Sequence, residues 1–262
     1  MRPAVTLAAS CYAPMTGGCG LRWPTDAACA VRRQDGGMPL LARRRRSAPA
    51  PVSAPLVRLR EVAVRTAEAE LLAPLSLEVE PGEVVAVTGP NGSGKTTLLR
   101  VIAGLTAPTA GTAEVAGAPV DERSREHRRR VAALVGTPPF ERDLTLEEHL
   151  AMVALSWGAT LDAAREGAVQ GLDSLRLLAL ARRFPHELSS GQTQLFSLAL
   201  VLARPSEVLL LDEPEQRLDV DRVPLAVEVL REAARDRAVL IATHSPLVTD
   251  GLATRELRLG RR

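Results

Sequence analysis

The stretch Gly89-Pro-Asn-Gly-Ser-Gly-Lys-Thr96 decides how the rest of the chain is interpreted. It follows the unbroken apolar run Val84-Val-Ala-Val87, which has the length of a buried strand, and it opens a helical pattern that runs to Ala103. It fits G-x-x-x-x-G-K-[ST], in which glycines let backbone N–H groups converge on phosphate oxygens while the helix N-terminus adds positive potential. The sequence therefore predicts a phosphate-binding loop between a strand and a helix.

Lys95 is the only lysine in a chain whose Lys and Arg residues number 33. Since every other cationic position is arginine, the retained ammonium favours a crowded phosphate site, where a planar guanidinium is no substitute. We expect Lys95 to reach the β and γ phosphates of a nucleotide and Thr96 to ligate Mg²⁺. The predicted nucleotide-binding residues of the loop are Gly89, Pro90, Asn91, Gly92, Ser93, Gly94, Lys95, Thr96 and Thr97.

A second sequence pattern, which contains two acidic residues, complements the loop. Val208-Leu-Leu-Leu-Asp-Glu-Pro214 reads as a buried strand that delivers two carboxylates to its C-terminal end, where ligands gather in open α/β sheets. We expect Asp212 to hold the metal and Glu213 to reach the water that attacks the γ phosphate. The alternative is that the two acids only cap a strand end.

Composition limits the classes of function. Apolar residues make up 46% and charged residues 24% of the 262 residues, as in folded water-soluble proteins, and no apolar run approaches the roughly 20 residues needed to cross a bilayer. Residues 1–56 carry eight arginines and two aspartates, a net charge of +6, so the remainder carries −4 of the overall +2. An acidic body is a poor polyanion binder, and nucleic acid is not expected as a partner.

The first 55 residues predict a disordered leader rich in Arg, Pro and Ala. They contain all three cysteines, whose spacings match no common zinc pattern, and they end in four consecutive arginines at 43–46 before a Pro- and Ala-rich stretch. A membrane-surface or nucleic-acid tether is the alternative interpretation of the arginine run. Met38 offers an alternative start, so residues 1–37 need not be made.

From residue 56 to 262 the pattern predicts one α/β domain. Val84-Val-Ala-Val87, Val208-Leu-Leu-Leu211 and Val239-Leu-Ile-Ala242 are apolar throughout, as in parallel strands that helices cover on both faces. Between about 121 and 189 strands disappear: Thr145-Leu-Glu-Glu148 predicts a capping box that opens a helix to Trp157, and residues 161–180 read as further helix. A helical subdomain is therefore predicted within the α/β core.

Two further segments carry a family resemblance. Leu188-Ser-Ser-Gly-Gln192, which ends 20 residues before Asp212, resembles the LSGGQ signature of ABC (ATP-binding cassette) ATPases. Ala242-Thr-His-Ser245, about 30 residues beyond Glu213, resembles the family's switch-histidine segment. Alone, Ser189 would suit an ordinary helix N-cap, and a histidine at a strand end is usually structural.

The resemblance covers residues 56–262 and implies a P-loop NTPase fold of ABC type, with a mostly parallel sheet, an antiparallel β subdomain and an inserted helical subdomain. It implies two cassettes facing head to tail, so that each ATP is bound by the phosphate loop of one subunit and the signature of the other. The implied cofactors are ATP and Mg²⁺, and the implied partners are a second cassette and a separate transmembrane permease, on the cytoplasmic face of the membrane. The implied catalytic residues are Glu213, His244 and Lys95, and the implied binding residues of the signature are Ser189, Ser190, Gly191 and Gln192.

The chain departs from the family pattern at four places. Gly136 stands where the Q-loop glutamine is expected, and no aromatic residue occurs at 64–66, where one usually stacks on adenine. The D-loop, usually Ser-Ala-Leu-Asp, reads Gln216-Arg-Leu-Asp219, and Ser190 replaces a glycine of the signature. We expect weak base selectivity, and we expect Ser190 to be tolerated.

Two other functions stay open beside that of a transporter ATPase. The missing Q-loop glutamine is compatible with a soluble ABC ATPase that serves a non-membrane assembly such as iron-sulfur scaffolding. A nucleotide-binding switch that hydrolyses poorly is the third possibility, against which Glu213 and His244 both argue.

Overall fold

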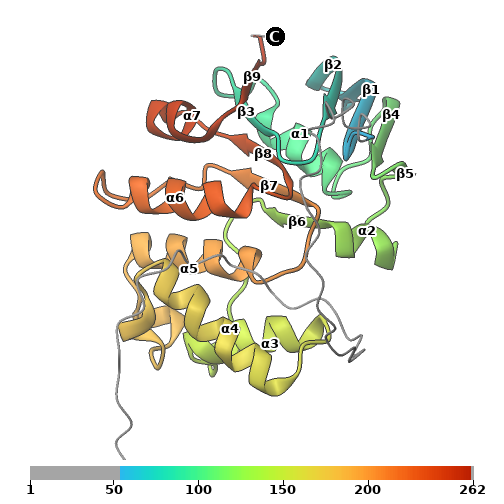
Figure 1. Cartoon of the computed structure of the whole chain (residues 1–262). Helices are drawn as coiled ribbons and strands as arrows, with labels where there is room; N and C mark the ends of the chain where they lie inside the picture. Colours follow the sequence, from blue (N-terminus) through green and yellow to red (C-terminus); the bar gives the residue numbers. More distant parts are fainter. Residues whose placement is uncertain (1–53, 261–262) are drawn as a thin grey trace, which may run out of the picture.

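The computed structural model of the chain describes residues 54–260, which form two sheets and a set of helices (Figure 1). The predicted leader falls, except for its last two residues, outside the described residues. The same holds for the three cysteines and for the arginines at 43–46.

A five-stranded sheet with the order β6-β7-β8-β3-β9 forms the centre, and every neighbouring pair in it is parallel. The predicted apolar runs supply its three middle strands, which confirms the mostly parallel core. The strands are β3 (Val84–Thr88), β6 (Val131–Leu134), β7 (Val208–Asp212), β8 (Ala238–Ala242) and β9 (Arg255–Arg258).

Both faces of this sheet are buried, which explains why its central strands are apolar throughout. In β7, Leu209 and Leu211 belong to one core cluster, whereas Val208 and Leu210 belong to the other. Three helices cover the first face and one covers the second (Figure 1). These are α5 (Ser190–Leu202), α6 (Val223–Ala233) and α7 (Pro246–Leu252) on the first face, and α1 (Lys95–Ile102) on the second.

An antiparallel sheet with the order β2-β1-β4-β5 packs on the α1 side, where its apolar residues share a core with that helix. From Leu75 to Val79, the side chains of β2 alternate between exposed and buried or half-buried, as expected for a strand with one face toward the core. The strands are β1 (Val57–Arg65), β2 (Glu70–Val79), β4 (Ala110–Val115) and β5 (Ala118–Pro119).

Helices α3 (Leu146–Ser156) and α4 (Leu161–Ser174) pack together at the end of the molecule away from the antiparallel sheet (Figure 1). The predicted capping box opens α3: the Thr145 hydroxyl accepts the Glu148 N–H at 3.3 Å, and the Glu148 carboxylate accepts the Thr145 N–H at 2.8 Å. The predicted helix over 161–180 is too long. It ends at Ser174 because Arg176 adopts φ 55°, and two short 3-10 turns, Leu178–Leu180 and Pro185–Glu187, follow.

The prediction that strands are absent between 121 and 189 is wrong at one place. Helix α2 (Arg125–Arg130) leads directly into β6, which pairs with β7 as the edge strand of the parallel sheet. The four-residue run Val131-Ala-Ala-Leu134 is too short and too rich in alanine to indicate a strand by its own propensity. Burial against the sheet, which the sequence does not reveal, makes it one.

Candidate nucleotide-binding and hydrolysis site

The phosphate loop lies between β3 and α1, as predicted, and it encloses Lys95. Lys95 is 7% exposed, and its Nζ donates to the backbone oxygens of Gly89 at 3.0 Å and Pro90 at 3.3 Å. Within the described residues, the hydrogen bonds of this buried ammonium go to neutral carbonyl oxygens, which leaves it available to a stronger acceptor such as a phosphate oxygen.

At two positions of the loop, both the positive φ and the lack of room for a Cβ atom require glycine. A Cβ on Gly89, which has φ 140°, would lie 2.4 Å from the Leu259 carbonyl oxygen, and one on Gly94, with φ 101°, would lie 2.7 Å from that of Leu71. The loop also contains an unsatisfied polar atom, because the buried Ser93 hydroxyl has no hydrogen-bond partner among the described residues. A tight backbone with a free hydroxyl fits an anionic ligand.

The two predicted metal ligands come together at the base of the loop. The Thr96 hydroxyl donates to Asp212 Oδ2 at 2.8 Å, which joins the first turn of α1 to the end of β7. Burial raises the pKa of Asp212 above its ordinary value; the charge of Glu213 adds to the rise, whereas the Thr96 hydrogen bond and the charge of Lys95 oppose it. Hydroxyl and carboxylate oxygens are ligands that Mg²⁺ accepts, so the pair fits that ion.

The predicted hydrolytic pair also meets. Glu213 follows β7 directly, and its Oε1 lies 3.7 Å from Nε2 of His244, which follows β8. Both side chains are partly open to solvent, at 35% and 45% exposure. Parallel strands place their carboxyl ends on one edge of a sheet, and this is why two residues about 30 positions apart converge.

Sequence reasoning missed the polar residues that surround this pair. Gln216 Nε2 donates to Glu213 Oε2 at 3.0 Å, and Gln194 Nε2 donates to the backbone oxygen of Glu213 at 3.3 Å. The buried Thr243 hydroxyl donates to the Glu215 carboxylate and accepts the Ser245 N–H at 3.0 Å. Only Gln216 carried a signal, as a departure from the family's D-loop.

The signature segment 188–192 opens helix α5. Ser189 is its N-cap and forms a capping box with Gln192, and Gly191 lies so close to the D-loop that a Cβ would be 3.0 Å from the Arg217 carbonyl oxygen. No hydrogen bond or ion pair within residues 54–260 joins this segment to the phosphate loop. Helices α1 and α5 pack on opposite faces of the sheet, so the fold of one chain does not unite the two predicted binding segments.

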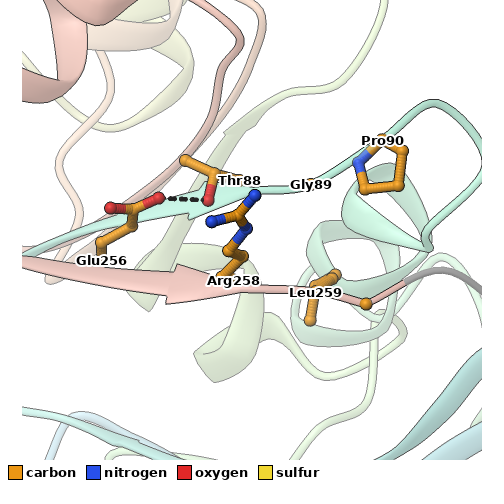
Figure 2. Close-up of a pocket in the computed structure, with 7 residues that line it drawn as sticks. Thr88, Gly89, Pro90, Glu256, Arg258 and Leu259 are labelled. Carbon is orange, nitrogen blue, oxygen red and sulfur yellow. Dashed lines mark hydrogen bonds between the residues drawn. The ribbon is translucent and has the colours of Figure 1, made fainter.

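Two hollows adjoin the start of the phosphate loop. The larger, of about 820 Å³, lies where β3 and β9 end, and Figure 2 shows Arg258 beside Thr88, whose hydroxyl donates to Glu256 at 2.5 Å. The smaller, of about 280 Å³, is lined by Thr88, Gly89, Thr243 and His244 among others. The second hollow therefore links the phosphate loop with His244.

Comparisons with known proteins identify the family of the chain. A family model described as "ABC transporter" matches residues 72–216. The chain is 38% identical over 171 residues to "Nod factor export ATP-binding protein I" of Burkholderia pseudomallei (strain 1710b), covering 65% of this chain and 56% of the relative. It is 39% identical over 196 residues to "Probable anion import ATP-binding protein" of Haloferax volcanii, covering 66% of each. The chain thus spans little more than half the length of the first of these curated relatives.

Solved structures show the same fold. One described as an ATP-binding subunit of an ABC transporter has a TM-score of 0.70 and 25% identity, covering 78% of this chain and 85% of its own. A dimeric bacterial ABC transporter cassette has a TM-score of 0.70 and 23% identity, covering 78% of this chain and 94% of its own. On the family match, the fold and the assembled phosphate loop, this chain belongs to the ABC transporter family, and its described part has the fold of an ATP-binding subunit of such a transporter.

Proposed function

We propose that the chain binds and hydrolyses ATP as the nucleotide-binding subunit of an ABC transporter, and that a head-to-tail cassette dimer couples hydrolysis to transport by a separate membrane subunit. One observation carries the proposal: the Thr96–Asp212 pair and the Glu213–His244 pair meet beside the buried Lys95 at one edge of the sheet. This set combines phosphate binding, metal ligands and a candidate base.

The residues divide the chemistry among them. Lys95 exchanges its two backbone acceptors for phosphate oxygens, and the Ser93 hydroxyl and the loop N–H groups provide further donors. Thr96 and Asp212 would hold Mg²⁺, which supplies neutralisation of charge on the phosphates when bound. Glu213 accepts a proton from the attacking water, and His244, 3.7 Å away, contacts the γ phosphate and helps to hold that water.

A dimer is proposed because the signature segment of one chain does not contact the phosphate loop of the same chain. Ser189 and Gly191 lie on the face of the sheet opposite α1, so a nucleotide on the phosphate loop can reach a signature only on another subunit. A neighbour in fold is described as dimeric, and another as dimeric with ADP and Pi bound. These descriptions support a second cassette as partner.

The proposed membrane partner accounts for two features. Among residues 54–260, no helix has the length and apolar character that crossing a bilayer requires. Five of the eight large apolar side chains that are exposed in this part of the chain lie on or next to α3 and α4: Met152, Leu155, Leu161, Val169 and Leu178. We propose this helical end as the permease-docking surface, which would hold the cassette at the cytoplasmic face of the membrane.

The direction and substrate of transport do not follow from the relatives, because one is named for export and another for anion import. A second function, an ABC ATPase of a non-membrane assembly, is favoured by Gly136, which puts no side chain where the family's glutamine would contact metal and partner. Co-purification from detergent separates the two: a partner with several apolar 20-residue segments supports transport, and a soluble scaffold supports the second function.

The Glu213→Gln variant tests hydrolysis and dimerisation together. An amide does not accept the proton of water but keeps the size of the acid, so ATP should stay bound and trap the closed dimer. Static light scattering should show a doubling of mass with Mg-ATP for Glu213→Gln, and none for wild type or for Glu166→Gln on the distant surface of α4. The double variant Glu213→Gln with Ser189→Arg should remain monomeric, and a dimer that survives Ser189→Arg would refute the proposed arrangement.

A further inference from the structure

Glu213 is held by two glutamines that come from different parts of the fold. Gln194 lies on α5, two residues beyond the signature segment, and its Nε2 donates to the backbone oxygens of Glu213 at 3.3 Å and Pro214 at 3.1 Å. Gln216, three residues after Glu213, donates through Nε2 to the carboxylate oxygen Oε2 at 3.0 Å. One amide therefore fixes the main chain and the other fixes the side chain.

The main chain at this position needs such support because its conformation is unfavourable. Glu213 has φ 48°, in the left-handed region that residues other than glycine rarely adopt. Its N–H donates to the Ala242 oxygen at 2.8 Å and so continues the pairing of β7 with β8, while its own oxygen accepts the N–H of Gln216 at 2.9 Å. Gln194 adds a third restraint, which comes from α5.

The side-chain contact decides which carboxylate oxygen is free. Because Gln216 occupies Oε2, the other oxygen, Oε1, is the one that faces His244 at 3.7 Å. A serine at this position, as in the usual D-loop, is two bonds shorter and does not reach as a glutamine does. The restraint on the carboxylate is therefore a property of this chain's own D-loop.

We propose that Gln194 and Gln216 are positioning residues for ATP hydrolysis: together they present Oε1 of Glu213 toward the space beside His244. The inference rests on the proposed function, because it assigns Glu213 as the base. Neither glutamine touches Lys95 or any other residue of the phosphate loop through a hydrogen bond in the described chain, so their effect falls on the catalytic step and not on nucleotide binding.

Three alanine variants test this assignment. Gln194→Ala loses two hydrogen bonds to neutral carbonyl oxygens, and Gln216→Ala loses one to a carboxylate, so each should lower kcat about tenfold or more, with KM for ATP unchanged within twofold. The matched control is Gln170→Ala on α4, whose amide also donates to a glutamate, Glu166 at 3.2 Å, and whose loss should leave both constants unchanged. Gln216→Glu keeps the size of the side chain without a donor, so it should do no better than alanine.

Hydrogen exchange of the nucleotide-free protein gives a readout apart from turnover. Peptides covering residues 208–219 should exchange faster in Gln194→Ala than in wild type, because a restraint on the strained turn is lost, and should be unaffected in Gln170→Ala. A kcat within twofold of wild type for both Gln194→Ala and Gln216→Ala, or a KM that rises in proportion to the loss of kcat, overturns the positioning role while the proposed function stands. Unchanged exchange in Gln194→Ala overturns the role of that residue. A wild-type chain that does not hydrolyse ATP overturns the proposed function and this inference with it.

Discussion

Replacing Gly94 by alanine tests whether contact with β2 sets the shape of the phosphate loop. Gly94 is the N-cap of α1 at φ 101°, and an added Cβ would lie 2.7 Å from the Leu71 carbonyl oxygen and 3.0 Å from Leu72 Cδ1. Gly117 is the matched control: it has φ 75°, it lies in the turn between β4 and β5, and an added Cβ would meet nothing within 4 Å. The pair separates the cost of conformation from the cost of the clash.

The expected loss of stability is the sum of the conformational cost and the cost of the clash. An alanine in the left-handed region costs about 1 to 2 kcal/mol, which applies to both variants. The clash at Gly94 involves backbone of β2 and is not relieved by rotating a side chain, so about 1 to 3 kcal/mol is added, the range for overpacking. At about 2 to 4 °C per kcal/mol for a domain of this size, Gly117→Ala should melt about 3 to 6 °C below wild type and Gly94→Ala about 10 °C below it.

Calorimetry measures both consequences. Because the loop must move away from β2, the N–H groups around the phosphates move with it, and Gly94→Ala should bind ATP at least about tenfold more weakly. Gly117→Ala, far from the loop in the sequence, should bind ATP as wild type does. A melting temperature of Gly94→Ala within 2 °C of that of Gly117→Ala, or an unchanged affinity for ATP, would refute the argument that β2 shapes the loop.

Three further predictions concern binding and pH. Lys95→Arg should abolish ATP binding in calorimetry without a change in fold by circular dichroism, because the guanidinium is too wide for the buried position of the ammonium; an affinity within a few-fold of wild type would contradict the role of Lys95. GTP should compete with ATP within about tenfold, since no aromatic residue at 64–66 supplies the stacking that is worth about 1 to 3 kcal/mol elsewhere; a preference for ATP above a hundredfold would show another stacking surface. Burial lowers the pKa of His127 below 6.5, against the Ala103 hydrogen bond and the Asp121 charge, so the unfolded chain binds the proton more readily and stability should fall as pH drops below about 6.5. His127→Gln should flatten that slope in melting curves between pH 7.5 and 5.5, and an equal slope in both proteins would assign it to other groups.

The parts of the fold that the sequence predicts are those whose cause is local. The loop at 89–96, the carboxylates after β7 and the capping box at Thr145 each depend on residues within a few positions of one another, and the structure contains all three. The sequence predicts the end of this helix six residues too late, because the apolar pattern continues through Leu177 and Leu180 although α4 ends at Ser174. Leu175 and Leu177 are buried by tertiary packing, and periodicity alone does not distinguish that burial from a longer helix.

Some contacts of the candidate site could likewise be predicted from the sequence, and others could not. The pairing of Thr96 with Asp212 could be expected, because a phosphate loop and a buried acidic strand end meet at one sheet edge in this class of fold. The contacts of Gln194 and Gln216 with Glu213 could not be expected, because no sequence pattern indicates which acceptor a glutamine on a helix surface or in a turn will bind. Only the packing of α5 against the end of β7 brings Gln194 within reach.

The phosphate loop and Glu213 depend on different parts of the fold. Lys95 is held by two carbonyl oxygens of its own loop, and that loop packs closely on the Leu71 and Leu259 carbonyl oxygens, so none of these contacts with the nucleotide-binding loop involves α5. The geometry of Glu213 depends on β8 through Ala242, on α5 through Gln194 and on the D-loop through Gln216. Substitutions that loosen the packing of α5 on the sheet should therefore lower the rate of ATP hydrolysis while the affinity for ATP stays unchanged. Because α3 and α4 both contact α5, we expect a partner bound to these two helices to act on the packing that holds Gln194 without touching the phosphate loop.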